Sequence, residues 1–209
     1  MVEKITKYQR AFLRFVPSPF AELLAELLFE SGVHFKIVKG RKTKWGDFRP
    51  KNIKGKPQIT VNGDLNPYAF LITTLHEFAH LQTFQQYGLH AAPHGVEWKR
   101  NFQALISRII DHPELPSSLR TALNKSINSL KASSCTDITL SRALASFDKV
   151  DTSVITLEKL PKNSKFVLNN RTFQKGLKRR TRFECLELSS NQTYLVHLMA
   201  KVQYIEDEE

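Results

Sequence analysis

The sequence predicts an α+β fold, in which a small three-stranded sheet packs on one long helix, further helices follow, and a small β-ribbon ends the chain. Three observations lead to this prediction. Apolar residues keep helical spacing after Asn66, short β-type segments precede that stretch, and strand patterns return after residue 153. A chain of 209 residues can hold one core-building domain and a small appendage, so domains are expected at 1–150 and 151–209.

The first half of the chain contains the elements that should build the core. Apolar residues recur at helical spacing over 19–30. The long helix starts at Asn66, a good N-cap, with Pro67 in the favoured first helical position and Gly88 as a natural stop. The expected strands are 34–38, 44–48 and 58–61 before this helix, and 165–168, 182–188 and 194–202 near the end of the chain. Further helices are expected at 95–110, 117–131 and 137–147.

The formal net charge of +11 is concentrated in two blocks of the sequence. Nine Lys or Arg residues with a single acid, Asp47, lie in the segment 36–56, and nine more with no acid lie in the segment 159–182. Two such blocks suit a polyanionic partner, nucleic acid first, and the plainer interpretation is a basic surface that is only solvated. The residues expected to contact DNA are Lys42, Lys44, Arg49, Lys178, Arg179 and Arg180.

Neither membrane insertion nor a disulfide framework is expected. The richest apolar stretch, 20–29, contains Glu22 and Glu26 and is shorter than the roughly 20 residues that span a bilayer. The two cysteines, Cys135 and Cys185, cannot build a disulfide framework or a four-cysteine zinc site. Because the N-terminal residues also lack an apolar signal segment, the sequence favours a cytoplasmic protein, and we expect a monomer.

The chemistry of this chain is expected at the pentapeptide HEFAH, which runs from His76 to His80 inside the long helix. Positions i and i+4 of a helix lie on one face about 5–6 Å apart, so both imidazoles can reach one tetrahedral zinc ion. Glu77 lies beside them and can take a proton from a zinc-bound water without being a ligand itself. The alternative is a helix with two surface histidines. Leu75 and Leu81 flank the motif, however, and a core helix rarely buries such groups without a partner.

A third protein ligand is needed for zinc, and three residues downstream are candidates. They are His90, His94 and Glu97. An arrangement with a histidine six residues after His80 is excluded, because Gln86 stands there. His94 is favoured, since it precedes a helix whose apolar stripe would pack beside the motif helix, and Gly95 allows close backbone approach.

Together these features resemble the SprT-like metallopeptidase family. The residues that carry the resemblance are Leu75 to His80, His94-Gly95-Val96-Glu97-Trp98, and the segments 44–49 and 58–62. The resemblance implies a zincin-like, gluzincin-like core that binds one zinc ion per chain, with Glu77 as the general base. The zinc ligands that it implies are His76, His80 and His94. It also implies a protein substrate and proteolysis of proteins on or near DNA.

The end of the chain departs from that family. Many SprT-like proteins end in a cysteine-rich zinc ribbon, and this chain has only Cys185 in that region. We therefore expect a metal-free β-ribbon, held by Phe166, Phe173, Phe183 and Tyr194, whose basic loop 175–182 either contacts phosphate or only caps the catalytic domain. A nucleic-acid-binding or regulatory protein with a mainly structural zinc is the alternative function, and a metal hydrolase acting on a non-peptide bond is a third.

Overall fold

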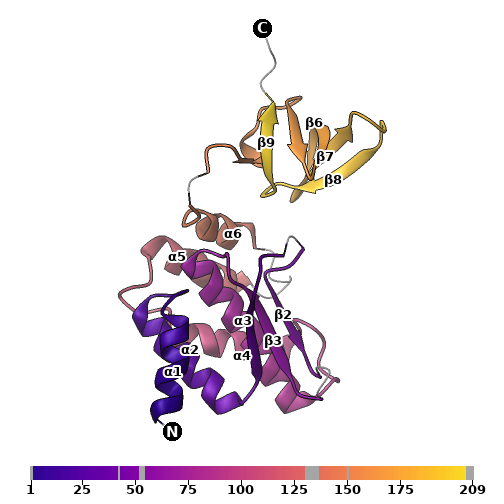
Figure 1. The fold of residues 1–209 in the computed structure, drawn as a ribbon. Helices are drawn as coiled ribbons and strands as arrows, with labels where there is room; N and C mark the ends of the chain where they lie inside the picture. Colours follow the sequence, from indigo (N-terminus) through magenta and orange to yellow (C-terminus); the bar gives the residue numbers. More distant parts are fainter. Residues whose placement is uncertain (1, 42, 52–54, 130–136, 150, 206–209) are drawn as a thin grey trace. The chain divides into compact units, whose positions relative to one another are not determined.

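The structure is a computed structural model that describes residues 2–41, 43–51, 55–129, 137–149 and 151–205. It confirms the α+β class, with six α-helices, a three-stranded sheet and a six-stranded sheet in the described part of the chain (Figure 1). The chain divides into two compact units, Met1–Asp148 and Lys149–Glu209, close to the boundary expected at 150. Among the described helices, none combines the length and apolarity that a membrane span requires.

The first unit contains the α-helices and the three-stranded sheet. The helices are α1 (Val2–Phe12), α2 (Ser18–Ser31), α3 (Pro67–Tyr87), α4 (Val96–Ser107), α5 (Ser117–Ser129) and α6 (Ile138–Ala145). The strands are β1 (His34–Val38), β2 (Gly46–Arg49) and β3 (Gln58–Asn62). β3 is the central strand, because β1 pairs with it in parallel and β2 pairs with it in antiparallel. β2 is therefore an outer strand.

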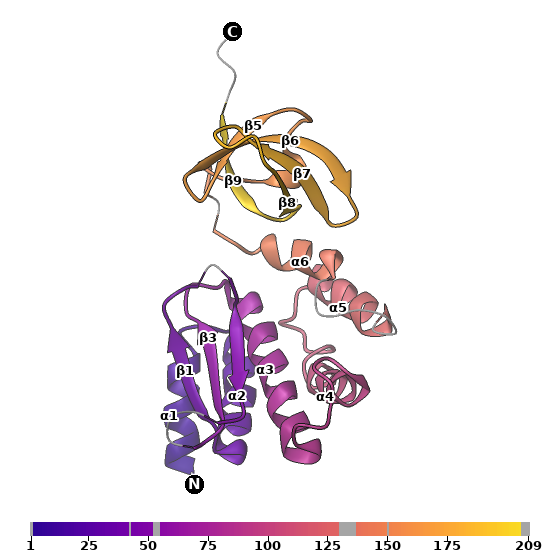
Figure 2. The same cartoon turned by 90° about the vertical axis from the view of Figure 1, so that its right-hand side faces the viewer.

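The core of this unit lies between the sheet and the helices on one of its faces, and no described helix covers the other face (Figure 2). Phe35 on β1 illustrates the packing, since its ring centroid lies 5.3 Å from that of Phe12 on α1 and 6.3 Å from that of Phe78 on α3. Ile59 and Val61 of β3 are fully buried. α3, with buried residues along most of its length, runs through this core.

The loop between β1 and β2 is fixed by Asn62, a buried residue at the end of β3. Its side-chain amide donates to the carbonyls of Arg41 and Lys44 at 3.1 and 3.0 Å. Its Oδ1 accepts from Arg41 Nε at 2.8 Å, and Arg41 also donates to Thr60 Oγ1 at 3.0 Å. A buried amide with its donors and acceptor paired is stable, so Asn62 holds the chain at the point where β2 begins.

The start of α3 has the cap that the sequence predicts. Asn66 Oδ1 accepts from the backbone N–H groups of Tyr68 and Ala69 at 3.1 and 2.9 Å. The amide of the same side chain donates to the carbonyl of Leu144 at 2.9 Å and to Asp148 Oδ1 at 2.7 Å. One asparagine thus caps α3 and ties it to the end of α6.

Helix α1 is not predicted from the sequence, where residues 1–10 show only mixed charges. Its apolar side consists of Ile5, Tyr8 and Phe12, which lie at helical spacing and pack against the core. Three apolar residues among many charged ones give too weak a pattern to predict a helix. Tertiary packing decides the structure of this segment.

The second unit is a six-stranded sheet with more strands than the ribbon expected from the sequence. Its elements are β4 (Ile155–Thr156), the 3-10 helix η1 (Leu157–Lys159), β5 (Lys165–Leu168), β6 (Arg171–Arg179), β7 (Arg182–Glu187), β8 (Thr193–His197) and β9 (Lys201–Ile205). Neighbouring strands are antiparallel in the order β4-β9-β5-β6-β7-β8. Phe166, Phe173, Phe183 and Cys185 are buried in this unit, and Tyr194 is half-buried beside Phe173. Cys135 lies outside the described residues.

The segment 175–182 forms a β-hairpin, which corrects the expectation of a basic loop there. Lys175, near its start, is only 4% exposed. Its Nζ donates to the carbonyl of Leu160 and lies 4.0 Å from the centroid of the Phe183 ring. A lysine that looks like a surface charge in the sequence therefore serves the core, because carbonyls and an aromatic face replace its water.

The expected strand 194–202 is two strands in the structure. The chain turns between β8 and β9, where the Ala200 N–H donates to the carbonyl of His197 at 2.9 Å. The apolar pattern continues through this turn with Leu198, which is fully buried. Periodicity alone therefore gives no sign of the break.

Replacement of Asn66 by alanine should lower the free energy of unfolding by about 1–2 kcal/mol, because an N-cap and the bonds to α6 are lost together. Urea denaturation followed by circular dichroism measures the change. Asn66→Ser is the matched control: it keeps a cap acceptor and should recover part of the loss. Wild-type stability in Asn66→Ala would contradict the role of the cap.

Candidate metal centre

The motif residues His76, Glu77 and His80 lie in the middle of α3, near α4 and β2. Their neighbours Leu75 and Phe78 are buried in the core. Glu77 itself is 6% exposed, and both histidines are partly buried. The helix therefore holds three ionisable side chains at the margin of the core, where unpaired charge is costly.

Helix α4 packs against this part of α3 through Trp98 and Asn101. The indole of Trp98 is 1% exposed, and its centroid lies 4.7 Å from the His76 ring and 5.3 Å from the His80 ring. Asn101 Nδ2 donates to Thr83 Oγ1 at 3.0 Å in a buried hydrogen bond between the two helices. These contacts fix the start of α4 beside the motif.

His94 reaches the motif from the turn that precedes α4. The Gly95 N–H donates to the carbonyl of Ala92 at 2.8 Å, and His94 has a φ of 58°, in the left-handed region. Histidine adopts the left-handed region more readily than most residues, yet this backbone conformation still costs about 1–3 kcal/mol of strain. A Cβ at Gly95 would lie 2.9 Å from the carbonyl oxygen of Ala92, so glycine is required there.

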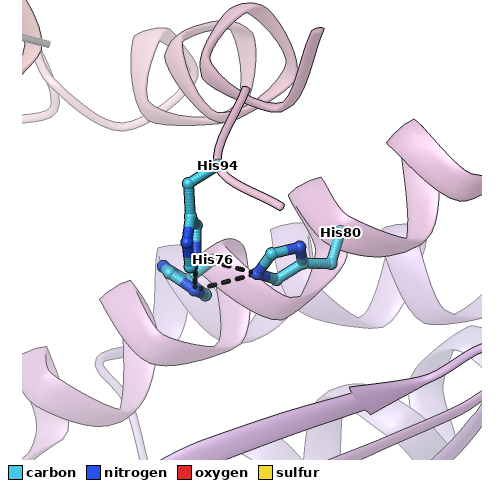
Figure 3. Close-up of side chains that lie close together, drawn as sticks. All are labelled: His76, His80 and His94. Atoms are coloured by element: carbon cyan, nitrogen blue, oxygen red, sulfur yellow. Dashed lines mark hydrogen bonds between the residues drawn. The ribbon is translucent and has the colours of Figure 1, made fainter. Parts of the chain in front are cut away.

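The three imidazoles converge on one point, as Figure 3 shows. Nε2 of His76 lies 3.2 Å from Nε2 of His80, and Nε2 of His94 lies 3.1 Å from each of the other two. Nitrogen ligands of a tetrahedral zinc ion, at about 2.0–2.1 Å from the metal, are about 3.3 Å from one another. The three histidines therefore lie close enough together to hold a metal ion, with a spacing near that of such a site.

Burial keeps these histidines uncharged. It lowers the pKa of His76 to about 3 and that of His80 to about 4, and neighbouring histidine rings add to both effects. Burial also lowers the pKa of His94. Since metals bind the neutral imidazole, the cluster needs to release no proton before it binds a cation at neutral pH.

Glu77 lies between α3 and β2. Burial and the nearby charge of Asp47 raise the pKa of Glu77 to about 8. Arg41, Lys44 and a hydrogen bond from the backbone N–H of Phe48 oppose the shift. A divalent cation at the histidines would add another positive charge beside this carboxyl group and favour its ionised form.

A cleft of about 530 Å³ opens at this place, and the three histidines and Glu77 line it together. On one side the ring of Phe48 stacks on His80, with centroids 6.4 Å apart. Most of the other lining side chains are apolar; they include Phe84, Leu89, Ala91, Ala92 and Pro93. A bound molecule would meet apolar walls around a small group of nitrogen and oxygen atoms.

Comparison with models of protein families, with curated proteins and with solved structures finds no match for this chain. The resemblance to SprT-like proteins thus rests only on the sequence motifs that carry it.

The other two candidate ligands lie apart from the histidine cluster in the described part of the chain. His90 is exposed in the loop after α3. Glu97 lies in the first turn of α4, where an acid interacts favourably with the helix dipole.

The basic residues expected to contact DNA in the first unit are largely engaged with the protein. Lys44 Nζ and Arg49 Nε both pair with Asp47, at 2.7 and 2.8 Å. These bonds hold the pKa of Asp47 below its usual value, although burial raises it. Lys42 lies outside the described residues.

In the second unit, the expected contacts Lys178, Arg179 and Arg180 lie together at the β6–β7 hairpin. All three are exposed. Arg180 occupies the turn with a φ of 50°, and Arg179 pairs with Glu184 at 2.8 Å. The structure thus brings together the hairpin half of the expected set.

Several residues that shape the site are not assigned to it from the sequence. Asn101 is one, and the sign in the sequence is an amide inside the apolar stripe of a helix. Gly46 and Phe48 are others, which contact Glu77 from β2. The feature of the sequence that points to them is the glycine within a short strand, because such a glycine often allows another element to approach closely.

Replacement of His94 by alanine should weaken zinc binding by on the order of 100-fold or more, because one of three ligands is lost. Competition with a chromophoric chelator and metal analysis measure the affinity and the expected content of one zinc ion per wild-type chain. His90→Ala and Glu97→Ala are the controls and should bind zinc like wild type. Unchanged zinc affinity in His94→Ala would refute the cluster as the metal site.

Proposed function

We propose that this protein is a zinc-dependent metalloendopeptidase of the SprT-like type. The observation that carries the proposal is that three histidine Nε2 atoms at 3.1–3.2 Å spacing and the carboxyl group of Glu77 line one cleft. A cytoplasmic location is part of the proposal and is favoured by the low cysteine content.

The donor set supports zinc with an open coordination position. Three imidazoles are a common ligand set of catalytic zinc, and a structural site has four protein ligands. Within the described residues, no fourth ligand joins the three histidines, which favours catalysis over a structural role. Zinc held at His76, His80 and His94 would supply Lewis acidity in the cleft.

Glu77 is suited to the role of general base. Its carboxyl group is buried beside the histidines but is not part of their cluster. In the ionised form it can accept a proton from a water molecule in the cleft as that water attacks a carbonyl carbon, and it can later deliver the proton to the leaving amine.

The outer edge of β2 supports a peptide as the substrate. The Asn62 N–H donates to the carbonyl of Trp45 at 2.8 Å, which makes these two residues a hydrogen-bonded pair of the antiparallel ladder. Because such pairs alternate, the peptide groups of Gly46 and Phe48 point away from β3. No described strand occupies this edge, so an extended chain can pair with the peptide group of Gly46 and the carbonyl of Phe48, while the Phe48 N–H donates to Glu77.

Replacement of Glu77 by glutamine should lower kcat for peptide hydrolysis by about 10²–10⁴-fold, because the general base is lost. Zinc content should stay at the wild-type level, since Glu77 is not a ligand. Cleavage of casein and of a quenched peptide library measures the rate, and metal analysis of the same samples is the control.

Three results would redirect this proposal. Full hydrolysis by Glu77→Gln would refute the mechanism. Hydrolysis of esters or DNA but not of casein by the wild type would favour a non-peptide hydrolase. Tightly bound zinc with no hydrolysis of any substrate would favour a nucleic-acid-binding or regulatory protein with structural zinc.

We further propose that the β6–β7 hairpin contacts a polyanion, with DNA as the first candidate, so that substrates are proteins on or near DNA. The support is local: four exposed basic residues lie within five positions, and Glu184 is their one acidic partner in the hairpin. They are Lys178, Arg179, Arg180 and Arg182.

Lys178→Ala/Arg180→Ala should weaken DNA binding and reduce the slope of log K against log salt concentration by about 0.9 per lost phosphate contact. Fluorescence anisotropy with duplex and single-stranded DNA at several salt concentrations measures this slope. Lys4→Ala/Lys7→Ala on α1 removes the same charge from exposed residues and should have little effect. Equal slopes for the two variants would contradict a contact at the hairpin.

A further inference from the structure

Strand β2 approaches α3 so closely at Gly46 that no side chain fits between them. A Cβ built there would lie 2.8 Å from Cγ of Glu77 and 2.8 Å from Cγ2 of Thr73. Thr73 and Glu77 are one helical turn apart, so they form the same face of α3. The nearest atoms all belong to these two side chains and none to a histidine.

The same strand contacts the carboxyl group of Glu77 through its backbone. The Phe48 N–H donates a hydrogen bond to it. This N–H is available because the peptide groups of Gly46 and Phe48 point away from β3, as the pairing of Trp45 with Asn62 requires. A buried carboxylate is oriented by such a donor, since a lost bond would leave it unpaired.

Phe48 also joins the two parts of the site. Its ring stacks on His80 with an interplanar angle of 5°, and packs 5.9 Å from the ring of Phe84. The start of the strand is held in turn by Asn62, which binds the carbonyls of Arg41 and Lys44. β2 is thus fixed at its start and contacts α3 along its length.

We propose that β2 is a positioning element for the Glu77 carboxylate, with Gly46 providing the space and the backbone N–H of Phe48 setting its direction. The inference rests on the proposed function, because it assigns Glu77 the role of base. It goes further by naming residues that act on the base through Glu77 and supply no nitrogen ligand to the metal. Metal binding and base positioning are then separable properties of the site.

The first experiment uses Gly46→Ala in the full chain. Its methyl group should displace the Glu77 side chain, so kcat should fall by on the order of 10–100-fold with KM within about twofold of wild type. Zinc affinity should remain at the wild-type value, because the atoms nearest to the added methyl group belong to Glu77 and Thr73 and not to a histidine. Circular dichroism checks that the variant folds.

A readout without catalysis comes from the cobalt-substituted protein. The pH dependence of its visible absorption reports ionisation in the site and should differ between wild type and Glu77→Gln. The absorption of cobalt-substituted Gly46→Ala should change with pH in the same way as that of Glu77→Gln. The double variant Gly46→Ala/Glu77→Asp should return towards wild type, because the shorter side chain leaves room for the methyl group. A Gly46→Ala titration that coincides with wild type would overturn the proposal.

The role of the backbone N–H is tested by comparing Phe48→Pro with Phe48→Ala. Both variants lose the ring, but only proline also removes the donor, at a position where the strand does not use it for pairing. The cobalt titration should shift further in Phe48→Pro than in Phe48→Ala. Cobalt titrations that coincide for Phe48→Pro and Phe48→Ala would overturn the role of the Phe48 N–H. If the wild-type protein hydrolyses no peptide, the proposed function fails. The cobalt titrations would still show whether β2 positions the Glu77 carboxylate.

Discussion

The burial of three ionisable side chains in the middle of a core helix is the constraint on which the rest of this structure depends. His76, Glu77 and His80 lie at the margin of the core of the first unit, where each lone pair and each charge needs a partner. The turn that delivers His94 and the close approach of β2 supply such partners, and Trp98 packs against the rings of His76 and His80. The geometry of the site follows from the need to stabilise these ionisable groups in the protein interior.

The two sides of the helix are served by different parts of the chain. The turn before α4 adds the third nitrogen, and the interhelical bond from Asn101 to Thr83 keeps α4 in register with α3. On the other side, Asn62 fixes the loop from which β2 emerges, and β2 meets Glu77. Two buried asparagines therefore set the geometry of the site from a distance, Asn62 by binding backbone carbonyls and Asn101 by binding a side chain of α3.

The sequence predicted the helix that carries the motif well, because Asn66, Pro67 and Gly88 are strong local signals at its ends. The sequence also favoured His94 as the third candidate ligand, because the apolar stripe of the next helix predicts packing beside the motif helix. It did not reveal Gly46 or Asn101, since a close contact between elements depends on tertiary structure. Lys175 shows the limit in the other unit: composition counts it as surface charge, whereas the fold places its ammonium group among carbonyls.

The origin of His94 in a separate segment has a consequence for folding. His80 and His94 are 14 positions apart, so a shared metal ion would act as a cross-link that closes a loop of that length. For a covalent bridge, closing a loop of about 15 residues removes roughly 3 kcal/mol of chain entropy from the unfolded state. The capped helix α3 has its own stabilising contacts, whereas the strained turn around His94 gains the most from such a bridge. Cation binding would therefore order residues 88–95. The degree of order in that segment would then show whether a cation occupies the site.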